Sequence, residues 1–344
     1  MKKLRLTALV LALVLIAAFI PGCGKTETTA SPSPSPTASE SPSPTPDTRE
    51  TIKLGLLKGP TGVGAAKLLS DNDMNETANI YDVTLAAEPT ELVSAIVAGT
   101  VDIAAVPTNL AASLFNKTDR GVQLLALNTL GVLYILENGD TVHSISDLAG
   151  KTLYATGQAS NPEYILDYIL RAAGLEPGVD VDIEYKESAE LVTLMAAGEV
   201  SLAMLPVPAA TTVLMKNSDV RSAIDLTEAW NDVVEDGTLT MGCVIVRKDF
   251  ADEHHDLVNS FLDEYGASID YVENNVDEAA AMVAQYGITA SEEIAKAAIP
   301  DCNLTFVTGT DMRDQLQEYY MALYQADPAS VGGSIPDDAF YYVP

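Results

Sequence analysis

A glycine-rich turn near the start of the folded part of the chain is the first place where this sequence could bind a small molecule. The turn, GPTGVG from Gly59 to Gly64, lies between a predicted apolar strand and a predicted helix. It does not match a nucleotide-binding loop, because no Ser or Thr follows Lys67 directly and the glycines lack the GxGxxG spacing. Such a turn presents Thr61, Gly62 and backbone N–H groups at a helix N-terminus, which suits a carboxylate, a sulfonate or another polar group. A tight strand-to-helix connection without a ligand explains the same residues equally well.

Polar residues also follow predicted strands elsewhere in the chain. Thr108 and Asn109 come after the apolar strand 101–106, and Thr156 begins a polar turn after a strand in the second half. In open α/β sheets ligands bind outside the carboxyl ends of strands, so these turns are predicted to line a cleft. The predicted ligand-binding residues are Thr61, Gly62, Thr108, Asn109, Thr156, Gly157, Gln158 and Asn161. Helix capping alone would also explain Thr108 and Asn161, the latter as the N-cap of a helix whose first residue is Pro162.

Residues with the spacing of a catalytic or metal site are scarce. The chain has three His, two of them within the acidic stretch DEHHD that is typical of a solvated surface, and it contains neither HExxH nor GxSxG. Apart from Cys23, only Cys243 and Cys302 are present, and they either pair outside the cell or remain buried free thiols. Trp230, the only Trp, either stacks on a planar ligand or belongs to a core. The sequence therefore predicts no catalytic residues, no metal and no cofactor.

A repeated unit indicates how these turns are positioned. The stretches ELVSAIVAGTVDIAAVPTNLAASL (91–114) and ELVTLMAAGEVSLAMLPVPAATTVL (190–214) share Glu-Leu-Val, Ala-Gly and a later Pro in register. Each copy predicts a helix, a tight Gly turn, a buried strand and a Pro that opens the next helix. Two copies predict two similar lobes, although a chance likeness between α/β units is the simpler alternative.

The rest of the pattern predicts an α/β fold. Strands alternate with helices up to about residue 248, which implies mostly parallel sheets with right-handed crossovers. From Asp249 onward the pattern is helical, since Leu257, Phe261, Tyr265 and Ile269 recur at helical spacing. Further helices are predicted at 276–286, 291–298 and 310–326.

The N-terminus carries export signals. Basic residues precede an apolar run from Leu6 to Ile20, and Pro21-Gly22-Cys23 follows, as at the end of a secretory signal. Cys23 resembles the lipidated Cys of a bacterial lipobox, which predicts a signal peptide at 1–22; a simple signal peptide or an N-terminal anchor is the alternative. Residues 23–50 contain the Ser/Pro/Thr tract TASPSPSPTASESPSPTPD, which predicts a lipid-attached linker.

The formal charge of −30 excludes one class of partner. A surface this acidic repels phosphate backbones, which argues against nucleic-acid binding. It does not forbid an anionic ligand, because a buried cleft has its own local field.

Several stretches, in this order, resemble the solute-binding lipoproteins of ABC importers, above all the nitrate, sulfonate and taurine type and the related binders of pyrimidine vitamin precursors. They are the Cys23 motif with its linker, KLGLLKGPTGVGAAKLL, AEPTELVSAIVAGTVDIAAVPTNLAASL, DLAGKTLYATGQASNPEYIL and EHHDLVNSFLDEYGASIDYVENN. The resemblance implies a type II periplasmic-binding-protein fold with two lobes and a helical C-terminal region packed on lobe 1. It places lobe 1 at 51–136 plus 243–344 and lobe 2 at 137–242.

The same resemblance implies a function. Such a protein captures a small solute by lobe closure and delivers it to a permease; here the solute would be sulfonate-, nitrate- or taurine-like, or a heteroaromatic vitamin precursor. The implied partners are the ligand, the ABC permease and ATPase subunits, and the outer face of the membrane through a lipid on Cys23, with the protein itself a monomer. Across the cleft, Pro107-Thr108-Asn109 is expected to face Pro206-Val207-Pro208, one side polar and the other apolar.

Two other functions remain open from the sequence. An enzyme on the same fold is one, although the export signal and the absence of a Cys-rich motif argue against the thiamin-precursor enzymes. A surface sensor that uses the fold without transport is the other. Turnover of a bound compound would identify the enzyme.

Overall fold

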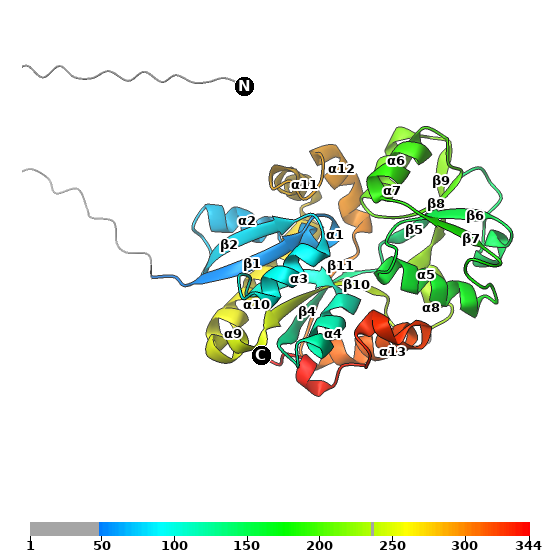
Figure 1. Ribbon diagram of the computed structural model, residues 1–344. Coiled ribbons are helices and arrows are strands. Elements are labelled where there is room, and N and C mark those ends of the chain that lie inside the picture. The colour runs from blue at the N-terminus through cyan, green and yellow to red at the C-terminus, as the bar shows by residue number, and fades with distance from the viewer. Residues whose placement is uncertain (1–47, 235–236) are drawn as a thin grey trace, which may run out of the picture. The chain divides into compact units, whose positions relative to one another are not determined.

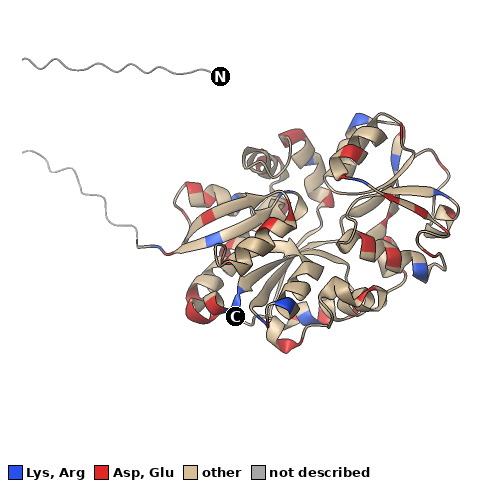
Figure 2. Ribbon diagram, in the orientation of Figure 1, with Lys and Arg blue, Asp and Glu red and all other residues tan. Residues whose placement is uncertain are grey.

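The computed structural model describes residues 48–234 and 237–344 (Figure 1). The predicted signal peptide, Cys23 and the linker as far as residue 47 lie outside the described residues, so their predicted roles stay predictions. Among the residues described, no helix has the length and apolar character needed to cross a membrane. Acidic residues are distributed over the helices around both sheets (Figure 2).

The first sheet has six strands, in the order β11-β4-β10-β3-β1-β2. Strand β1, next to the edge strand β2, is apolar along most of its length and pairs in parallel with β2 and β3, as buried strands of an α/β sheet do. The strands are β1 (Thr51–Leu57), β2 (Ile80–Ala86), β3 (Ile103–Pro107), β4 (Val122–Leu130), β10 (Thr240–Arg247) and β11 (Leu304–Thr308).

The second sheet has five strands, in the order β7-β6-β8-β5-β9. It repeats the order β2-β1-β3-β10-β4 of the first sheet, position by position, so the predicted pair of similar lobes is confirmed at the level of topology. The strands are β5 (Leu133–Asn138), β6 (Thr152–Ala155), β7 (Asp182–Tyr185), β8 (Leu202–Pro206) and β9 (Val220–Asp225).

The repeated sequence unit occupies the same place in both sheets. In the first it forms α3 (Pro89–Val97), β3 and α4 (Thr108–Lys117); in the second it forms α6 (Ser188–Ala196), β8 and α7 (Ala209–Lys216). Gly99 and Gly198 end the first helix of each copy with φ of 69° and 74°, a left-handed conformation that glycine adopts without strain. The aligned Ala-Gly of the two copies is therefore a helix stop.

The two-lobed α/β architecture is as predicted, but the strand directions need a correction. Each sheet is mixed rather than mostly parallel, because β10 runs antiparallel to β3 and β4, and β5 runs antiparallel to β8 and β9. These are the strands with which the chain enters one sheet after leaving the other. A strand that returns from the neighbouring sheet comes in against the direction set by the helix crossovers.

The chain passes between the sheets twice. The first passage is residues 131–132, between β4 and β5; the second contains α8 (Leu226–Asn231) and leads from β9 to β10. The predicted lobe limits at 136/137 and 242/243 fall inside β5 and β10.

Most of the remaining helices cover the sheets, and the C-terminal region is helical as predicted. In α10 the buried face is formed by Val258, Phe261, Leu262, Tyr265, Ile269 and Val272, while Leu257 is only half-buried. The other elements are α1 (Pro60–Val63), α2 (Ala66–Asp73), α5 (Asn161–Ala172), α9 (Lys248–Glu253), α10 (His255–Asn274), α11 (Val276–Gln285), α12 (Glu292–Ala298) and α13 (Thr310–Ala326), with the 3-10 turns η1 (Ile145–Leu148), η2 (Ile299–Asp301), η3 (Pro328–Val331) and η4 (Asp338–Phe340).

The core is continuous between the two halves. One apolar cluster contains Leu124 of the first sheet, Leu153 of the second and, between them, Trp230 and Tyr319. Trp230 is fully buried, and its indole N–H donates to the carbonyl of Gly237 over 3.0 Å. Of the two roles open to Trp230 from the sequence, the structure gives it the core role. Cys243 and Cys302 are both buried free thiols.

Candidate functional site

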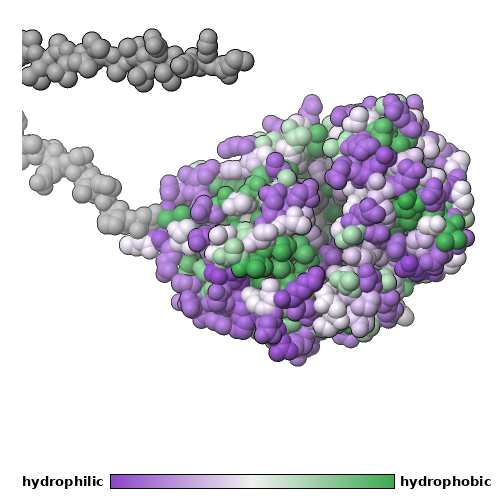
Figure 3. Space-filling model, viewed as in Figure 1, coloured by the Kyte–Doolittle hydropathy of each residue, from purple (hydrophilic) through white to green (hydrophobic). Residues whose placement is uncertain are grey.

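The loops predicted to bind a ligand lie where the two sheets approach each other. A hollow separates the two halves of the molecule in the space-filling view (Figure 3). Contacts from both sheets meet there: the Val207 N–H, beyond β8, donates to the carbonyl of Val132 in the passage between the sheets, and the amide nitrogen of Asn161 lies 3.5 Å from the sulfur of Met241 in β10. The strand ends of both halves therefore converge on one region.

The loop after β1 packs closely against the end of the first sheet. Gly62 is buried, and a Cβ at that position would lie 2.1 Å from the carbonyl oxygen of Leu57. The half-buried Thr61 accepts a hydrogen bond on its carbonyl from the side-chain amide of Asn128, over 3.1 Å. Thr61 and Gly62 thus form a compact corner, which is consistent with either interpretation of GPTGVG.

The first two residues of α4, Thr108 and Asn109, differ in the hydrogen bonds of their side chains. Thr108 is fully buried, and its hydroxyl faces the buried thiol of Cys243 and has no other hydrogen-bond partner in the part of the chain that the structure describes. Asn109 donates to the carbonyl of Ser330 over 3.3 Å, so its amide is used to hold η3. Pro107 is the N-cap of α4, and no side-chain capping bond is formed. Capping therefore does not account for the buried Thr108 hydroxyl.

The loop between β6 and α5 is the most open part of the predicted set. Gly157 has a φ of 84°, and a Cβ there would lie 2.6 Å from Cγ of Pro162, so both conformation and space require glycine. The Ser160 hydroxyl donates to the carbonyl of Gly157 over 2.6 Å and closes the turn. Thr156 is half-buried and Gln158 is exposed, so solvent reaches both side chains.

Asn161 does not have its predicted position. The N-cap of α5 is Ser160, and Asn161 is the first helical residue, only 2 % exposed. Its side-chain oxygen accepts a hydrogen bond from the hydroxyl of Tyr319 over 2.7 Å. A buried tyrosine hydroxyl needs a hydrogen-bond acceptor. Asn161 supplies it, so its side chain points into the protein and neither caps the helix nor faces solvent.

Three polar residues at this edge of the first sheet were not predicted. Asn128 and Thr129 end the otherwise apolar β4 and are almost fully buried; the Asn128 amide lies 2.8 Å from the Tyr265 hydroxyl, and the Thr129 hydroxyl donates to the Asn128 oxygen over 3.1 Å. Thr240, paired with Leu130, is fully buried with an unpartnered hydroxyl among the described residues. The sequence signal was available: Asn-Thr interrupts an apolar strand directly before Leu-Gly.

Two carboxylates stand near each other at the passage between the sheets. Asp225, at the end of β9, is opposite Tyr134 of β5 and accepts a hydrogen bond from the Thr227 N–H over 2.7 Å. Burial raises the pKa of the Asp301 carboxyl, and the nearby charge of Asp225 raises that pKa further. Burial, with these two carboxylates nearby, raises the pKa of Tyr134 to about 12.

Gly131 contacts both of the segments that carry the two carboxylates, Asp225 and Asp301. The side-chain amide of Asn303, two residues after Asp301, donates to the carbonyl of Gly131 over 2.5 Å. A Cβ on Gly131 would lie 2.1 Å from the hydroxyl oxygen of Thr227, two residues after Asp225. In the described chain, no Lys or Arg forms an ion pair with either carboxylate. This part of the site is acidic and has no basic side chain paired with it among the described residues, although Asp225 caps α8 through the Thr227 N–H.

The two copies of the repeated unit end differently, as predicted. Val207 is buried in the same apolar cluster as Val132 and Leu304, whereas Thr108 presents a hydroxyl. Lys58, directly after β1, is exposed and has no side-chain partner in residues 48–234 and 237–344. That the polar and apolar ends face each other across a bound ligand stays a prediction.

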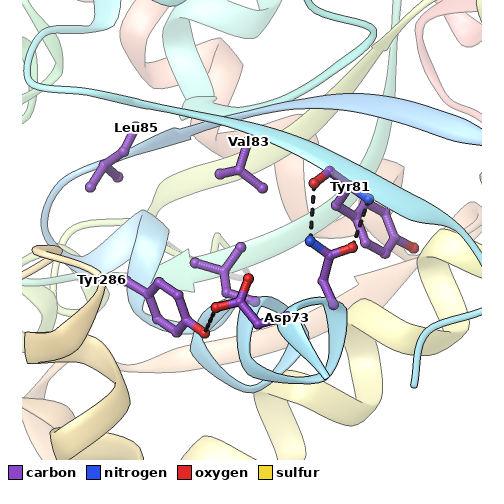
Figure 4. Close-up of a pocket in the computed structure, with 7 residues that line it drawn as sticks. Asp73, Tyr81, Val83, Leu85 and Tyr286 are labelled. Carbon is purple, nitrogen blue, oxygen red and sulfur yellow. Dashed lines mark hydrogen bonds between the residues drawn. The ribbon is translucent and has the colours of Figure 1, made fainter. Parts of the chain in front are cut away.

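A second hollow of about 340 Å³ lies along the outer edge of β2 (Figure 4). Its floor contains Leu69, Val83 and Leu85. The Asn72 side chain bonds to both the N–H and the carbonyl of Tyr81, at 2.8 and 3.0 Å, as a neighbouring strand would. The hollow therefore borders a partly protected sheet edge, and none of the predicted ligand-binding residues lines it.

Comparisons with known proteins agree on the class of protein. The model of a family described as the periplasmic substrate-binding protein of phosphonate ABC transporters matches residues 75–298. A search of curated protein sequences finds no match to the chain.

Solved structures show the fold. An ABC transporter protein from Parabacteroides distasonis superposes with a TM-score of 0.72 at 22 % identity, over 86 % of this chain and 98 % of its own. The periplasmic aliphatic sulphonate-binding protein SsuA from Escherichia coli gives a TM-score of 0.67 at 14 % identity, over 86 % and 93 %. The periplasmic nitrate-binding protein NrtA from Synechocystis gives 0.53 at 16 % identity, over 74 % and 69 %.

Proposed function

The chain belongs to the family of periplasmic substrate-binding proteins of phosphonate-type ABC transporters, and we propose from its site which kind of solute it carries. As a member of this family it is the solute-binding component of an import system. The proposed solute is a small phosphonic or sulfonic acid that also bears an amino group, as taurine does. The observation that supports this choice is the pair Asp225 and Asp301, two carboxylates with no basic partner in the described chain.

The acidic group of the solute needs a different environment. Neutral donors suit the oxygen atoms of a sulfonate or phosphonate: the hydroxyl of Thr108 beyond β3 of the first sheet, and the open loop at Thr156 and Gln158 beyond β6 of the second. Lys58 is the basic residue nearest in sequence to Thr61. A heteroaromatic vitamin precursor has less support, because Trp230 is fully buried and cannot stack on a ligand.

Binding is proposed to follow the two-lobe scheme. The proposed lobes are those expected from the sequence, 51–136 plus 243–344 and 137–242, with each limit moved to the end of the strand it would cut, so that the hinges fall between β4 and β5 and between β9 and β10. A solute between them stabilises the closed form, which docks on the permease. The protein is proposed to act as a monomer, anchored by a lipid on Cys23, and to release its solute unchanged.

The test is a thermal-shift panel on the mature chain with compounds matched in pairs. Taurine is compared with ethanesulfonate, and 2-aminoethylphosphonate with ethylphosphonate; nitrate and a pyrimidine complete the set. A solute at about a hundred times its dissociation constant adds roughly 2.7 kcal/mol to folding. We expect the amino compound of a pair to bind at least about tenfold more tightly, since a charge-assisted hydrogen bond contributes about 1.5–3 kcal/mol.

The matched variants are Asp225→Asn and Asp301→Asn, which should reduce the preference for the amino compound without abolishing binding of its partner. Equal binding of both members of each pair would refute the assignment of the amino group. Turnover of any compound would favour the enzyme alternative, and failure of every compound to bind would favour a sensor without this ligand class.

A further inference from the structure

Helix α13 contacts both halves of the molecule. It is connected to the first sheet through Gly309, which follows β11, and it lies next to α5 of the second half (Figure 1). Its buried face contains Met312, Leu316, Tyr319, Tyr320 and Leu323. The helix therefore links the two halves in addition to the two passages of the chain between the sheets.

The adjacent residues Tyr319 and Tyr320 point to different halves. In an α-helix neighbouring side chains are about 100° apart, because a turn contains 3.6 residues. The Tyr319 ring lies 5.9 Å from that of Trp230, which in turn lies 5.4 Å from Tyr168 of α5. The Tyr320 ring lies 6.3 Å from Phe340, which contacts Phe115 of α4 at 5.1 Å. Tyr319 thus packs with the second half and Tyr320 with the first.

Each tyrosine hydroxyl holds the start of a helix that carries part of the candidate site. Tyr319 donates to the side-chain oxygen of Asn161, the first residue of α5, over 2.7 Å. Tyr320 donates to the carbonyl of Thr108, the first residue of α4, over 3.1 Å. Both tyrosines are fully buried, and burial raises the pKa of both well above its ordinary value, so both hydroxyls stay protonated donors.

From this geometry we propose that Tyr319 and Tyr320 are positioning residues: together they set the separation of the two helix starts that flank the solute. The inference rests on the proposed solute-binding site between the halves. Because α13 follows the first sheet in the chain, rotation of the halves must break the bond from Tyr319 to Asn161, together with the weaker contact of the Asn161 amide with Met241 of β10. Tyr320 keeps α13 fixed on the half to which it already belongs.

The test uses two variants that each lose one buried hydroxyl. Tyr319→Phe removes the bond between the halves, and Tyr320→Phe is the matched control that removes the bond within one half. Spin labels are placed at Val97→Cys and Val179→Cys, which are 63 % and 79 % exposed and lie in different halves. The full chain carries Cys23→Ser, and the native Cys243 and Cys302 are buried, so only the introduced thiols react.

We expect electron–electron distance measurements without any solute to show a second, longer population in Tyr319→Phe and none in Tyr320→Phe. A purely structural role would lower the melting temperature of both variants without changing the distance distribution. An unchanged distribution in Tyr319→Phe, or the same change in both variants, would overturn the proposal.

Asn161→Ala provides a second route: it removes the acceptor of the same bond together with the contact to Met241, and it should give at least as large a longer population even if Tyr319→Phe does not fold. A wild-type distribution in Asn161→Ala counts against the proposal in the same way. The measurement involves no ligand, so its failure leaves the solute assignment untouched, and failure of the solute panel leaves this result untouched.

Discussion

Gly242 lies at a crowded point of the candidate site, and replacing it by Ala tests the arrangement directly. A Cβ at this position would lie 2.1 Å from the methyl carbon of Thr61, 2.7 Å from the side-chain oxygen of Asn128 and 3.0 Å from Cβ of Thr129. All of these contacts are shorter than ordinary van der Waals distance, so Thr61 and Asn128 must move. Their movement disturbs the bond from the Asn128 amide to the Thr61 carbonyl.

The magnitude follows from two effects. Overpacking a buried site costs about 1–3 kcal/mol, and weakening one buried hydrogen bond costs about 1 kcal/mol more. We therefore expect Gly242→Ala to lower the free energy of unfolding by about 2–4 kcal/mol, measured by urea denaturation followed by circular dichroism. Thr61→Ser, which deletes the methyl group in the closest contact, should cost about 1 kcal/mol alone.

The double variant Gly242→Ala/Thr61→Ser should be more stable than the sum of the two single effects predicts, by about 1 kcal/mol or more, because the closest clash is gone. Thr193→Ser is the matched control: it deletes an exposed methyl group on α6 and should not couple to Gly242→Ala. Additive effects of Gly242→Ala and Thr61→Ser would refute the packing argument.

Three further predictions use other parts of the molecule. The pKa of the Asp301 carboxyl is raised in the folded protein, so ionisation of this carboxyl destabilises the fold as the pH rises above the ordinary pKa of an aspartate. Asp301→Asn should therefore raise the melting temperature at pH 7 and lose that advantage in acid. A gain that does not depend on pH would contradict this. Asn72→Ala frees the outward N–H and carbonyl of Tyr81 at the edge of β2, so light scattering should show more aggregation on heating than for the surface control Asn274→Ala. Cys243 and Cys302 are buried, and burial raises the pKa of Cys302 to about 12, so both thiols should react with a thiol reagent only at the rate of unfolding; fast labelling of native protein would be inconsistent with the described core.

Much of the fold could be predicted because its determinants are local. The repeated unit predicted helix, strand and helix in the right order, since a buried strand is recognised by its apolar run and Gly99 and Gly198 by their role as helix stops. The C-terminal helices followed from the spacing of residues such as Phe261 and Tyr265. Strand direction did not, because β5 and β10 take theirs from the sheet they enter rather than from their own residues.

The site was harder to predict than the fold. Asn161 has the residue type and position of a cap, yet its side chain bonds to Tyr319, which is 158 positions away in the sequence. Thr108 and Asn109 are adjacent, yet the hydroxyl of one faces the buried thiol of Cys243 and the amide of the other is used to hold η3. Such differences depend on which buried polar group, distant in the sequence, requires a hydrogen-bond partner. A local sequence pattern does not contain that information.

The negative charge of the chain would oppose binding of an acidic solute only if surface charges acted over a long range. At physiological ionic strength the screening length is about 8 Å, so a formal charge of −30 spread over the surface acts weakly on a solute inside a hollow. Local groups decide, and here they differ along the site: neutral donors at Thr108 and the 156–158 loop, carboxylates at Asp225 and Asp301. A simple anion gains from the first region but is repelled by the second. Under the proposed function, a solute with an acidic end and a basic end would gain from both, and its amino group would also relieve the repulsion between the two carboxylates.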